Sequence, residues 1–373
     1  MPDFTLIHAD IHDALRGIPD ATFDTVIADA PYGLAITKNA TGTNWDASSI
    51  AFDPDLWAEL RRVTKPGGTL AAFGHPKTAH RQTVALENAG WQALDTLAWV
   101  KAHGYQAGNR DLEKELRKTG AEALADSYAG FGTHLQPSFE PISLARNLAT
   151  RSSLVQTIVN GGAGGLNHDL TRVQESDWAW NTPRATAEPT TENRARRPGR
   201  VTDRSTWSIA HRETISVPHE GGRLPGNLIL EHSEDCAETA CALGCVVAEI
   251  DAQGRTKYAA GREPASRFFT RLRYSPRARA SVGAGGVGAN HPTEKPQQLL
   301  EWLAALVVKP GATVLDAFAG SGGVSEAALR AGALAVTAIE RESDYCEMIR
   351  VRITGMGTQS AGLSETTAAK PTT

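Results

Sequence analysis

Short apolar runs separated by stretches of helical period occur toward both ends of the chain. Near the N-terminus, runs rich in apolar and β-branched residues predict strands at residues 5–8, 25–28, 69–73 and 96–100. Residues 53–62 and 77–88 place apolar side chains three or four positions apart, which predicts helices. The alternation returns after residue 291, with strands expected at 313–316 and 334–339. Strands that alternate with helices indicate an α/β fold.

The middle of the chain has a different character. Residues 104–288 contain the glycine-rich stretch 161–165, long polar stretches and little sustained periodicity, which is typical of irregular loops. We therefore expect a doubly wound sheet built from both chain ends, residues 1–103 and 289–354, with a large segment inserted between them. Residues 355–373 are polar and are predicted to form a disordered tail.

The strand predicted at residues 25–28 ends in Asp29, Ala30, Pro31 and Tyr32. These residue types suit the methylation of an exocyclic amino group on a planar base. The Asp29 carboxylate and the Ala30 carbonyl can each accept a hydrogen bond from the amino group, which draws the nitrogen lone pair out of the ring and makes it nucleophilic. Pro31 stiffens the turn, and Tyr32 offers a face on which an extruded base can stack. The alternative interpretation is an ordinary strand-to-turn corner.

A second motif follows the strand predicted at residues 313–316. Asp316 and Phe318 precede a turn that contains Gly320 and Gly322, and a helix-period stretch follows. Strand, glycine turn and helix form the first crossover of a nucleotide-binding sheet, although the spacing is not that of the dinucleotide fingerprint. S-adenosylmethionine suits this turn because it has an amino-acid end and no pyrophosphate. Glu340 ends the next strand, about 20 residues past the first glycine, where an acid can bind ribose hydroxyls.

In this order, the two motifs resemble those of the β group of DNA amino-methyltransferases, and most of all the phage-type, site-specific adenine methylases. The likeness covers most of the chain: it includes residues 7–10, the Asp29 motif, residues 65–70, residues 99–101 and residues 291–296. Two positions depart from the family pattern. Ala30 replaces the usual proline, which should be tolerated because its carbonyl is what is used. Gly323 replaces the usual threonine, which should loosen a hydrogen bond to the cofactor carboxylate.

The resemblance implies an S-adenosylmethionine-dependent enzyme that methylates the N6 amino group of a flipped-out adenine in double-stranded DNA. It implies that Asp10 lies near the cofactor adenine and that residues 291–296, among them His291, Thr293 and Lys295, line the methionine end. An aspartate at the first motif position favours adenine, because cytosine-N4 relatives usually carry serine there. A cytosine-N4 enzyme, an RNA or protein amide methyltransferase and an inactive DNA-binding relative remain alternatives. A restriction endonuclease is a candidate partner, whereas the recognition sequence and the oligomeric state are not indicated.

The net charge of −4 does not by itself favour DNA binding, but the basic residues are clustered. Eight arginines and lysines lie within residues 255–279, interleaved with Phe268, Phe269 and Tyr274. We expect Arg267, Arg271, Arg273 and Arg277 to neutralise DNA phosphates, and the aromatic rings can stack on bases. A solvated charged loop is the alternative interpretation.

The composition, 41% hydrophobic and 21% charged, is that of an ordinary globular protein. No secretion signal is apparent, and no apolar run approaches the ~18 residues of a membrane helix, so we expect a cytoplasmic protein. Four cysteines argue against a disulfide framework. Three of them, Cys236, Cys241 and Cys245, lie close to His232 in the sequence and are candidate zinc ligands, although their spacing is not that of the usual knuckle. Reduced buried thiols are the alternative.

Overall fold

The computed structural model describes residues 2–34, 48–101, 110–149, 152–173, 222–238, 240–253, 265–274 and 294–356, together with the backbone of residues 364–367. Its elements in chain order are β1 (Asp3–His8), α1 (Ile11–Arg16), β2 (Phe23–Ala28), η2 (Ile50–Phe52), α2 (Pro54–Val63), β3 (Thr64–Phe73), α3 (Ala79–Asn88), β4 (Gln92–Val100), α4 (Leu112–Lys118), α5 (Glu122–Ser127), β5 (Phe139–Arg146), α6 (Leu154–Val159), α7 (His168–Thr171), β6 (Leu228–Glu231), α9 (Val246–Gln253), η3 (Ala265–Phe268), β7 (Thr270–Leu272), α10 (Gln297–Val307), β8 (Thr313–Asp316), α11 (Gly323–Arg330), β9 (Ala335–Glu340), α12 (Ser343–Gly355) and β10 (Ser364–Thr367). Within these residues, no helix combines the length and the apolar character needed to span a bilayer.

Ten strands of the described residues form one sheet in the order β10-β1-β9-β8-β2-β3-β5-β4-β6-β7. β8 and β9, from the C-terminal part of the chain, lie between β1 and β2, and all of these neighbours pair in parallel. The middle of the sheet is therefore completed by two strands that lie about three hundred residues after β1 and β2 in the sequence. This interleaving confirms the doubly wound α/β architecture predicted from the two chain ends.

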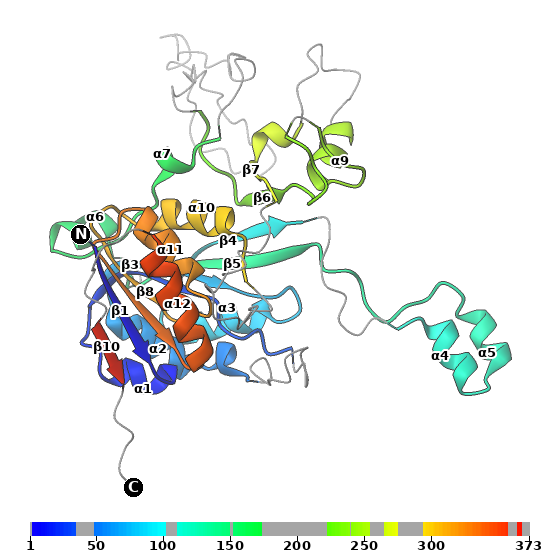
Figure 1. Ribbon diagram of the computed structural model, residues 1–373, viewed down its shortest axis with the longest axis horizontal. Helices are drawn as coiled ribbons and strands as arrows, with labels where there is room; N and C mark the ends of the chain where they lie inside the picture. The colour runs from blue at the N-terminus through cyan, green and yellow to red at the C-terminus, as the bar shows by residue number, and fades with distance from the viewer. Residues whose placement is uncertain are drawn as a thin grey trace, which may run out of the picture.

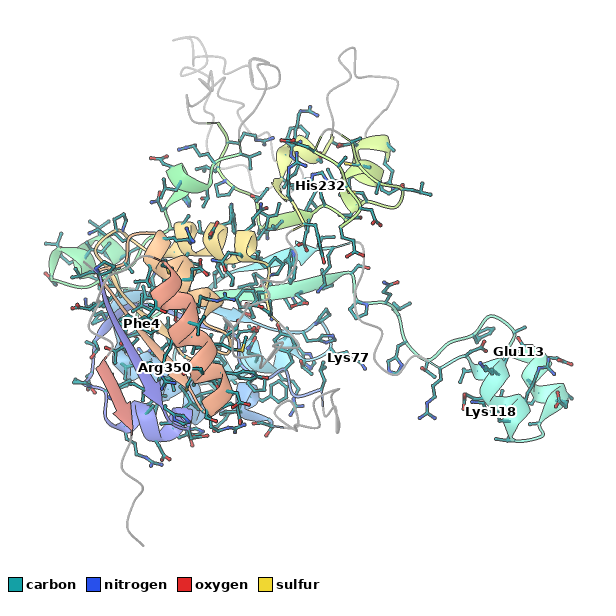
Figure 2. All side chains as sticks on the ribbon, in the orientation of Figure 1. Phe4, Lys77, Glu113, Lys118, His232 and Arg350 are labelled. Carbon is teal, nitrogen blue, oxygen red and sulfur yellow. The ribbon has the colours of Figure 1, made fainter. Side chains whose placement is uncertain are left out.

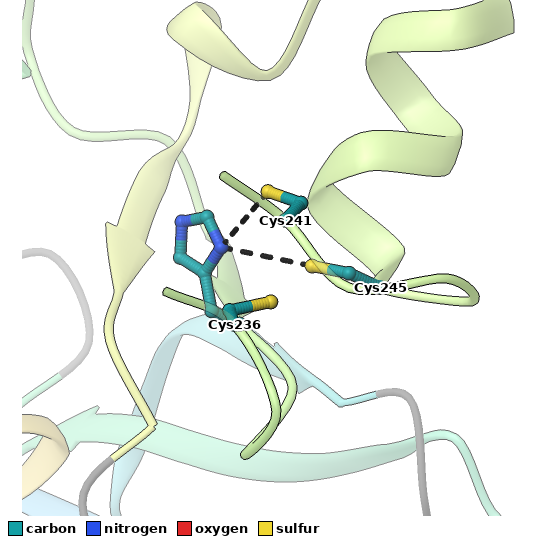
Figure 3. A group of neighbouring side chains, drawn as sticks. Cys236, Cys241 and Cys245 are labelled. Atoms are coloured by element: carbon teal, nitrogen blue, oxygen red, sulfur yellow. Dashed lines mark hydrogen bonds between the residues drawn. The ribbon is translucent and has the colours of Figure 1, made fainter. Parts of the chain in front are cut away.

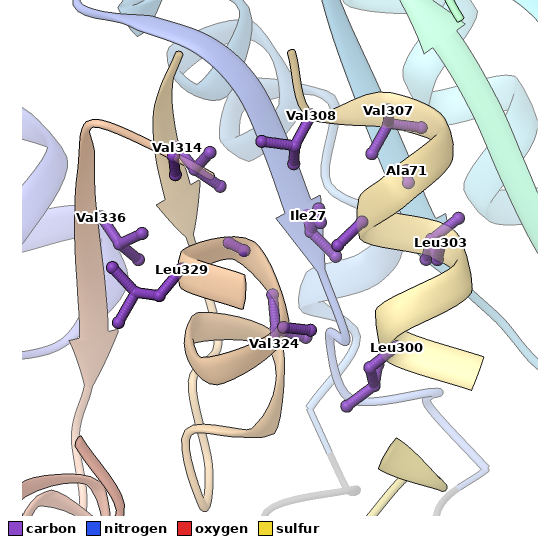
Figure 4. Packing of buried hydrophobic residues seen from close by; sticks show 14 of the residues in the cluster. Ile27, Ala71, Leu300, Leu303, Val307, Val308, Val314, Val324, Leu329 and Val336 are labelled. Atoms are coloured by element: carbon purple, nitrogen blue, oxygen red, sulfur yellow. The ribbon is translucent and has the colours of Figure 1, made fainter. Parts of the chain in front are cut away.

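Helices cover both faces of this sheet (Figure 1). α10, α11 and α12 contribute to one apolar cluster, and α1, α2 and α3 contribute to a second. Successive side chains of a strand point to opposite faces, so Ile27 of β2 enters the first cluster while Val26 and Ala28 enter the second. Figure 4 shows Ile27 in the first cluster together with Leu303 of α10. Burial on both faces explains why these strands are near-continuous apolar runs.

α10 illustrates how the apolar pattern fixes a helix next to the strand ends. Its buried residues include Leu299, Leu300, Leu303 and Leu306, which recur at intervals of one helical turn and face the sheet. Pro296 precedes the helix as its N-cap residue. The packing of α10 therefore holds Lys295, which precedes Pro296, against the ends of the strands.

Three strands of the sheet come from the segment that the sequence predicts to be an irregular insert. β5 pairs antiparallel with both β3 and β4, and β6 and β7 extend the same sheet beyond β4. The predicted boundary at residue 104 therefore does not separate the sheet from the insert, because residues 139–146 lie inside the sheet. Residues 141–145 are buried. A short apolar run has the same pattern in a buried strand as in a buried helix, so the pattern alone does not identify β5.

The predicted disordered tail also needs a correction. Residues 364–367 form β10, which pairs in parallel with β1 from Thr5 opposite Ser364 to His8 opposite Thr367. A polar segment can add a strand here because the edge of β1 presents unpaired backbone groups, which hydrogen-bond to any chain whatever its side chains are. Residues 357–363 and 368–373 lie outside the described residues.

A helical hairpin projects from the rest of the molecule (Figure 1). α4 and α5 pack on each other, and a bridge between Asp111 and Gly132 closes the base of the hairpin. Arg117 ties the two helices together through salt bridges to Glu113 of α4 and to Glu122 and Asp126 of α5. Figure 2 places Glu113 and Lys118 on this arm, far from the sheet.

Candidate active site

Four neighbouring parallel strands end at the same edge of the sheet, and an acidic residue lies at each end. In the order of the strands, Asp10 follows β1, Glu340 ends β9, Asp316 ends β8 and Asp29 follows β2. The register pairs His8 with Glu340 and Ile27 with Asp316, which brings these carboxyl groups to one level. The carboxyl ends of the strands are where doubly wound sheets bind their ligands.

The turn after β8 needs glycine at two positions. Gly320 and Gly322 have φ angles of 51° and 82°, in the left-handed region that glycine adopts without steric cost. A Cβ atom on Gly322 would also lie 3.1 Å from Cγ1 of Ile349. The turn therefore brings backbone without side chains to the strand ends, and a ligand can approach it closely.

Asp316 is fully buried between this turn and α11. Its Oδ2 atom accepts a hydrogen bond of 2.7 Å from the Ser325 hydroxyl, whereas no donor reaches Oδ1 from the described residues. Burial raises the pKa of Asp316 to about 7. A buried acceptor atom without a donor is uncommon in proteins, so Oδ1 suits a ligand that brings a hydrogen-bond donor to this point.

Glu340 is locked to the same turn. Its Oε2 atom accepts a hydrogen bond of 2.7 Å from the Gly320 N–H, and its Oε1 atom accepts from the N–H groups of Arg341 and Glu342 at 2.8 and 2.7 Å. Burial raises the pKa of Glu340 although these three donors favour its charged form. Each carboxylate oxygen retains lone-pair capacity, so the group can also accept from ligand hydroxyls.

The acid–Ala–Pro–Tyr turn is held by residues far away in the sequence. Lys295 Nζ donates to Asp29 Oδ2 at 2.7 Å, and the Tyr32 hydroxyl donates to Asp29 Oδ1 at 3.1 Å. The Lys295 side chain is only 7% exposed, and its ammonium group lies 5.1 Å from the centroid of the Tyr32 ring. Sequence reasoning assigns Lys295 to the methionine end of the cofactor; the structure places its ammonium group against the Asp29 carboxylate.

Glu140 of β5 is a member of this site that sequence reasoning missed. Its Oε2 atom lies 3.2 Å from the Tyr32 hydroxyl and 3.9 Å from Lys295 Nζ, and its Oε1 atom forms an ion pair with Lys101. Burial opposes the ionisation of Glu140, but the ammonium groups of Lys295 and Lys101 outweigh it and lower its pKa. A single acid ahead of an apolar run gives no distinctive signal in the sequence.

Tyr32 lies between these two carboxyl groups. Burial, together with the negative charges of Asp29 and Glu140, raises the pKa of the Tyr32 phenol well above its usual range. The Thr78 hydroxyl donates to the Tyr32 carbonyl at 2.9 Å and fixes the turn from the other side. Ala30 is 1% exposed, so the turn is also anchored by a buried side chain.

A buried ion pair stands behind the glycine turn. Glu294 Oε1 accepts from the Ser321 hydroxyl at 2.7 Å and is paired with Arg352 of α12. A Cβ atom on Gly323 would lie 2.8 Å from Cδ1 of Leu300 and 3.1 Å from Nη1 of Arg352. The ends of the Leu300 and Arg352 side chains therefore take up the space that the family's usual threonine would need, so glycine fits at position 323 without moving them.

Two further predicted site residues, Asp10 and Phe318, lie just after the ends of β1 and β8. Asp10 caps α1 by accepting from the His12 N–H at 3.0 Å, and Phe318 packs, partly buried, against the cluster under α1 and α2. His291, Thr293 and Arg277 lie outside the described residues.

The predicted DNA-binding arginines lie at the far edge of the sheet, where β7 is separated from β2 by β3, β5, β4 and β6. Arg267 and Arg223 both stack on the Phe268 ring, at 4.1 and 4.7 Å from its centroid. Arg271 of β7 is exposed. Arg273 donates to the carbonyl oxygens of Ala237 and Glu238, so its guanidinium group braces a neighbouring loop.

The candidate zinc ligands converge in that loop. Figure 3 shows Cys236, Cys241 and Cys245 gathered around one imidazole ring, that of His232. All four side chains thus belong to one cluster, which lies between β6 and α9.

Comparison with known proteins identifies the family. The DNA methylase family that comprises N6 and N4 enzymes matches residues 23–351 of the chain. The chain is similar to the type II methyltransferase M.HindIII of Haemophilus influenzae, with 24% identity over 176 residues, which cover 45% of this chain and 54% of that protein. It is also similar to the type II methyltransferase M2.LlaDCHI of Lactococcus lactis subsp. cremoris, with 31% identity over 112 residues, 26% of this chain and 42% of that protein. The match thus spans about half the length of these relatives.

Solved structures are similar along the whole chain at low identity. One is TTHA0409 from Thermus thermophilus, determined in complex with S-adenosyl-L-methionine. It is 15% identical to this chain, the alignment covers 97% of this chain and 99% of that one, and the TM-score is 0.43.

Proposed function

Because the chain belongs to the N6/N4 family of DNA methylases, we propose that it transfers a methyl group from S-adenosylmethionine to the N6 amino group of adenine in double-stranded DNA. The observation that carries this proposal is the buried contact between Asp29, Tyr32 and Lys295, next to a glycine turn that leaves its backbone bare. This arrangement offers a fixed hydrogen-bond acceptor beside a cofactor site. Because the Asp29 motif precedes the Gly320 turn in the sequence, we propose that the chain belongs to the β group.

The cofactor is S-adenosylmethionine, and the residues at the strand ends fit it. Asp316 has a buried acceptor atom that no described residue reaches, and Glu340 has remaining acceptor capacity for ribose hydroxyls. Asp10 would lie on the adenine side, and Phe318, Gly320 and Gly322 would line the path of the ligand. When bound, S-adenosylmethionine supplies an electrophilic methyl group.

Asp29 acts on the target amino group. Its carboxylate is held in place by an ion pair with Lys295, so it can accept a hydrogen bond from the amino group and stabilise the positive charge that develops on the nitrogen. The Ala30 carbonyl accepts the second hydrogen bond, and Pro31 has no N–H to compete for it. Tyr32 supports the flipped base by stacking. No covalent intermediate with the protein is required.

The adenine assignment depends on Asp29, because cytosine-N4 relatives usually carry serine at this position. The same pair of acceptors would also serve the 4-amino group of cytosine. A test of the proposal must therefore show whether adenine or cytosine carries the new methyl group.

DNA would bind along the arginine-rich side of β7. Arg267 and Arg271, together with Arg277, would neutralise phosphates, which makes affinity fall steeply with salt. Arg273 holds the adjacent loop through two carbonyl oxygens, so its contribution to DNA binding would be partly indirect. A restriction endonuclease that cuts the same site would be the functional partner.

The test is direct analysis of methylated DNA. The purified chain is incubated with unmethylated DNA and S-adenosylmethionine that carries a deuterated methyl group. The DNA is then digested to nucleosides, which are separated by chromatography and identified by mass spectrometry. We expect labelled N6-methyldeoxyadenosine, and a rate on the order of 10²–10³ lower for Asp29→Ala, with cofactor affinity in calorimetry changed by no more than a few-fold. Labelled N4-methyldeoxycytidine would replace the adenine assignment. Unlabelled DNA, or an Asp29→Ala variant with normal turnover, would refute the proposed chemistry.

A further inference from the structure

Four potential metal ligands meet in the loop between β6 and α9 (Figure 3). The ligand atoms of His232, Cys236, Cys241 and Cys245 all lie within 4.8 Å of one another. His232 Nδ1 is 3.5 Å from the Cys241 sulfur and 3.6 Å from the Cys245 sulfur. Three thiols and one imidazole thus face a common centre.

The two histidine–sulfur distances are those of a tetrahedral site. With Zn–S bonds of about 2.3 Å and Zn–N bonds of about 2.0–2.1 Å, tetrahedral angles place a nitrogen and a sulfur ligand about 3.6 Å apart. The two histidine–cysteine separations match this value. Thiolate and imidazole ligands in this geometry favour zinc over magnesium or calcium, which prefer oxygen.

Simple packing accounts for only part of the cluster. Cys245 is fully buried and contributes to a small apolar core with Leu230 and Val247. Cys236 is half-buried and packs against this core, whereas Cys241 is exposed, so packing accounts for Cys236 only in part and does not account for Cys241. A side chain that is exposed, yet points with its sulfur toward three other ligand atoms, indicates a metal rather than a hydrophobic role.

The surroundings support the ligand atoms. The Ala242 N–H donates to the Cys236 sulfur at 3.3 Å, and outer hydrogen bonds of this kind orient metal ligands. Arg273 donates to the carbonyl oxygens of Ala237 and Glu238, in the stretch between the first two cysteines. Its positive charge also offsets the negative charge of a site with three thiolates.

We propose that His232, Cys236, Cys241 and Cys245 bind one structural Zn²⁺ ion. All four positions of the tetrahedron are filled by the protein, so the ion has no open position for water or substrate and its role is structural. The described part of the apolar core beside it is small, with Leu230, Cys245 and Val247 as its buried members, so a metal would add support for α9 and for the loop that joins it to β6. The ion would fix the loop that Arg273 braces and the strand that carries Arg271.

Metal content of the full-length protein tests the proposal. The protein is purified without chelators and analysed for zinc, and the ion is then exchanged for Co²⁺ to record its absorption. We expect about one zinc ion per chain and the intense visible bands and thiolate charge-transfer absorption of tetrahedral Co²⁺ bound by cysteine. Less than about a tenth of an ion per chain after reconstitution with zinc, or octahedral Co²⁺ spectra, would overturn the assignment.

Matched variants locate the site. Cys241→Ser changes an exposed ligand and should lose most of the bound zinc, whereas Cys346→Ser, which changes a buried cysteine of α12 outside the cluster, should retain it. Circular dichroism checks that each variant is folded, and His232→Asn replaces Cys241→Ser if the latter does not fold. Equal zinc content in the Cys241 and Cys346 variants would disprove the site. None of these readouts depends on methyl transfer, so the outcome is independent of the proposed function.

Discussion

The Tyr32 hydroxyl has one proton to donate and two carboxyl groups within reach, those of Asp29 and Glu140. Lys295 and Lys101 supply the positive charge that keeps the second carboxyl group ionised inside the protein. Removing one member of a buried charge network leaves its partners uncompensated. The network therefore sets the position of the acceptor on Asp29, although only Asp29 is proposed to contact the base.

Glu140→Gln tests this dependence. The amide keeps the shape of the side chain but removes its charge, so Lys101 loses its partner and Tyr32 no longer shares its proton between two carboxylates. We expect a methylation rate about 10-fold or more lower, by analogy with the removal of one preorganised contact, and unchanged binding of S-adenosylmethionine. Single-turnover kinetics and calorimetry measure the two effects. Glu87→Gln, on the exposed surface of α3, serves as the control, and equal rates for both variants would contradict the role of Glu140.

The environment of Gly323 leads to a second prediction at the scale of single residues. Gly323→Thr restores the family's usual residue, but its Cβ atom would lie 2.8 Å from Leu300 and 3.1 Å from Arg352. Overpacking of this kind typically costs about 1–3 kcal/mol in the free energy of unfolding. Chemical denaturation measures this loss, with Gly226→Thr as the control because no atom lies within 4 Å of a Cβ built at position 226. A fully stable Gly323→Thr variant would contradict the overpacking, because the Leu300 and Arg352 side chains would then move aside without cost.

At the scale of the elements, the end of β8 and the start of α11 enclose the Asp316 carboxyl group. Burial raises the pKa of Asp316 to about 7, whereas the pKa of an aspartate in an unfolded chain is about 3.9. Between these values the folded chain keeps a proton that the unfolded chain has released, so the free energy of unfolding falls as the pH rises. The strand–helix junction is therefore held most firmly at acidic pH when no ligand is present.

Asp316→Asn should remove this pH dependence. The asparagine oxygen can still accept from Ser325, but the side chain cannot ionise. We expect the stability of the variant relative to the parent to rise between about pH 4 and pH 7 and then to level off. Melting temperatures recorded across this range without S-adenosylmethionine provide the measurement. Asp3→Asn in β1, an exposed carboxyl group, should follow the parent, and an Asp316→Asn curve parallel to the parent would contradict the argument.

At the scale of the whole molecule, a compact doubly wound sheet carries an arm and an edge extension. The arm consists of α4 and α5, which pack on each other and are tied by Arg117. The extension consists of β6, α9 and β7, with their own small core. The proposed cofactor residues lie on neither of them, because β1, β9, β8 and β2 are at the other end of the strand order.

Removal of the arm tests this independence. Replacing residues 111–132 by a short glycine–serine linker should leave cofactor affinity unchanged and shift the melting temperature by no more than a few degrees, because the bridge between Asp111 and Gly132 closes the arm at its base. Calorimetry with S-adenosylmethionine and thermal melting are the measurements. A deletion variant that no longer binds the cofactor would show that the arm supports the sheet.

The local features of this protein follow from its sequence. Apolar runs and glycine turns are determined within a few residues, so the strands around Asp29 and Asp316 and the turn at Gly320 were predictable. The doubly wound fold followed from their alternation. The residue types of the acid–Ala–Pro–Tyr turn also led to the chemistry proposed for it, because each side chain has fixed donors and acceptors.

Contacts between distant segments were decided by the tertiary structure alone. Lys295 reaches Asp29 across 266 positions and Glu140 reaches Tyr32 across 108, and the placement of β5 inside the sheet and of β10 on its edge is equally remote from any local pattern. Such contacts depend on how packed helices and strands fix the ends of long loops, which no short stretch of sequence encodes. The sequence therefore determined which groups are present, and the fold decided which of them meet.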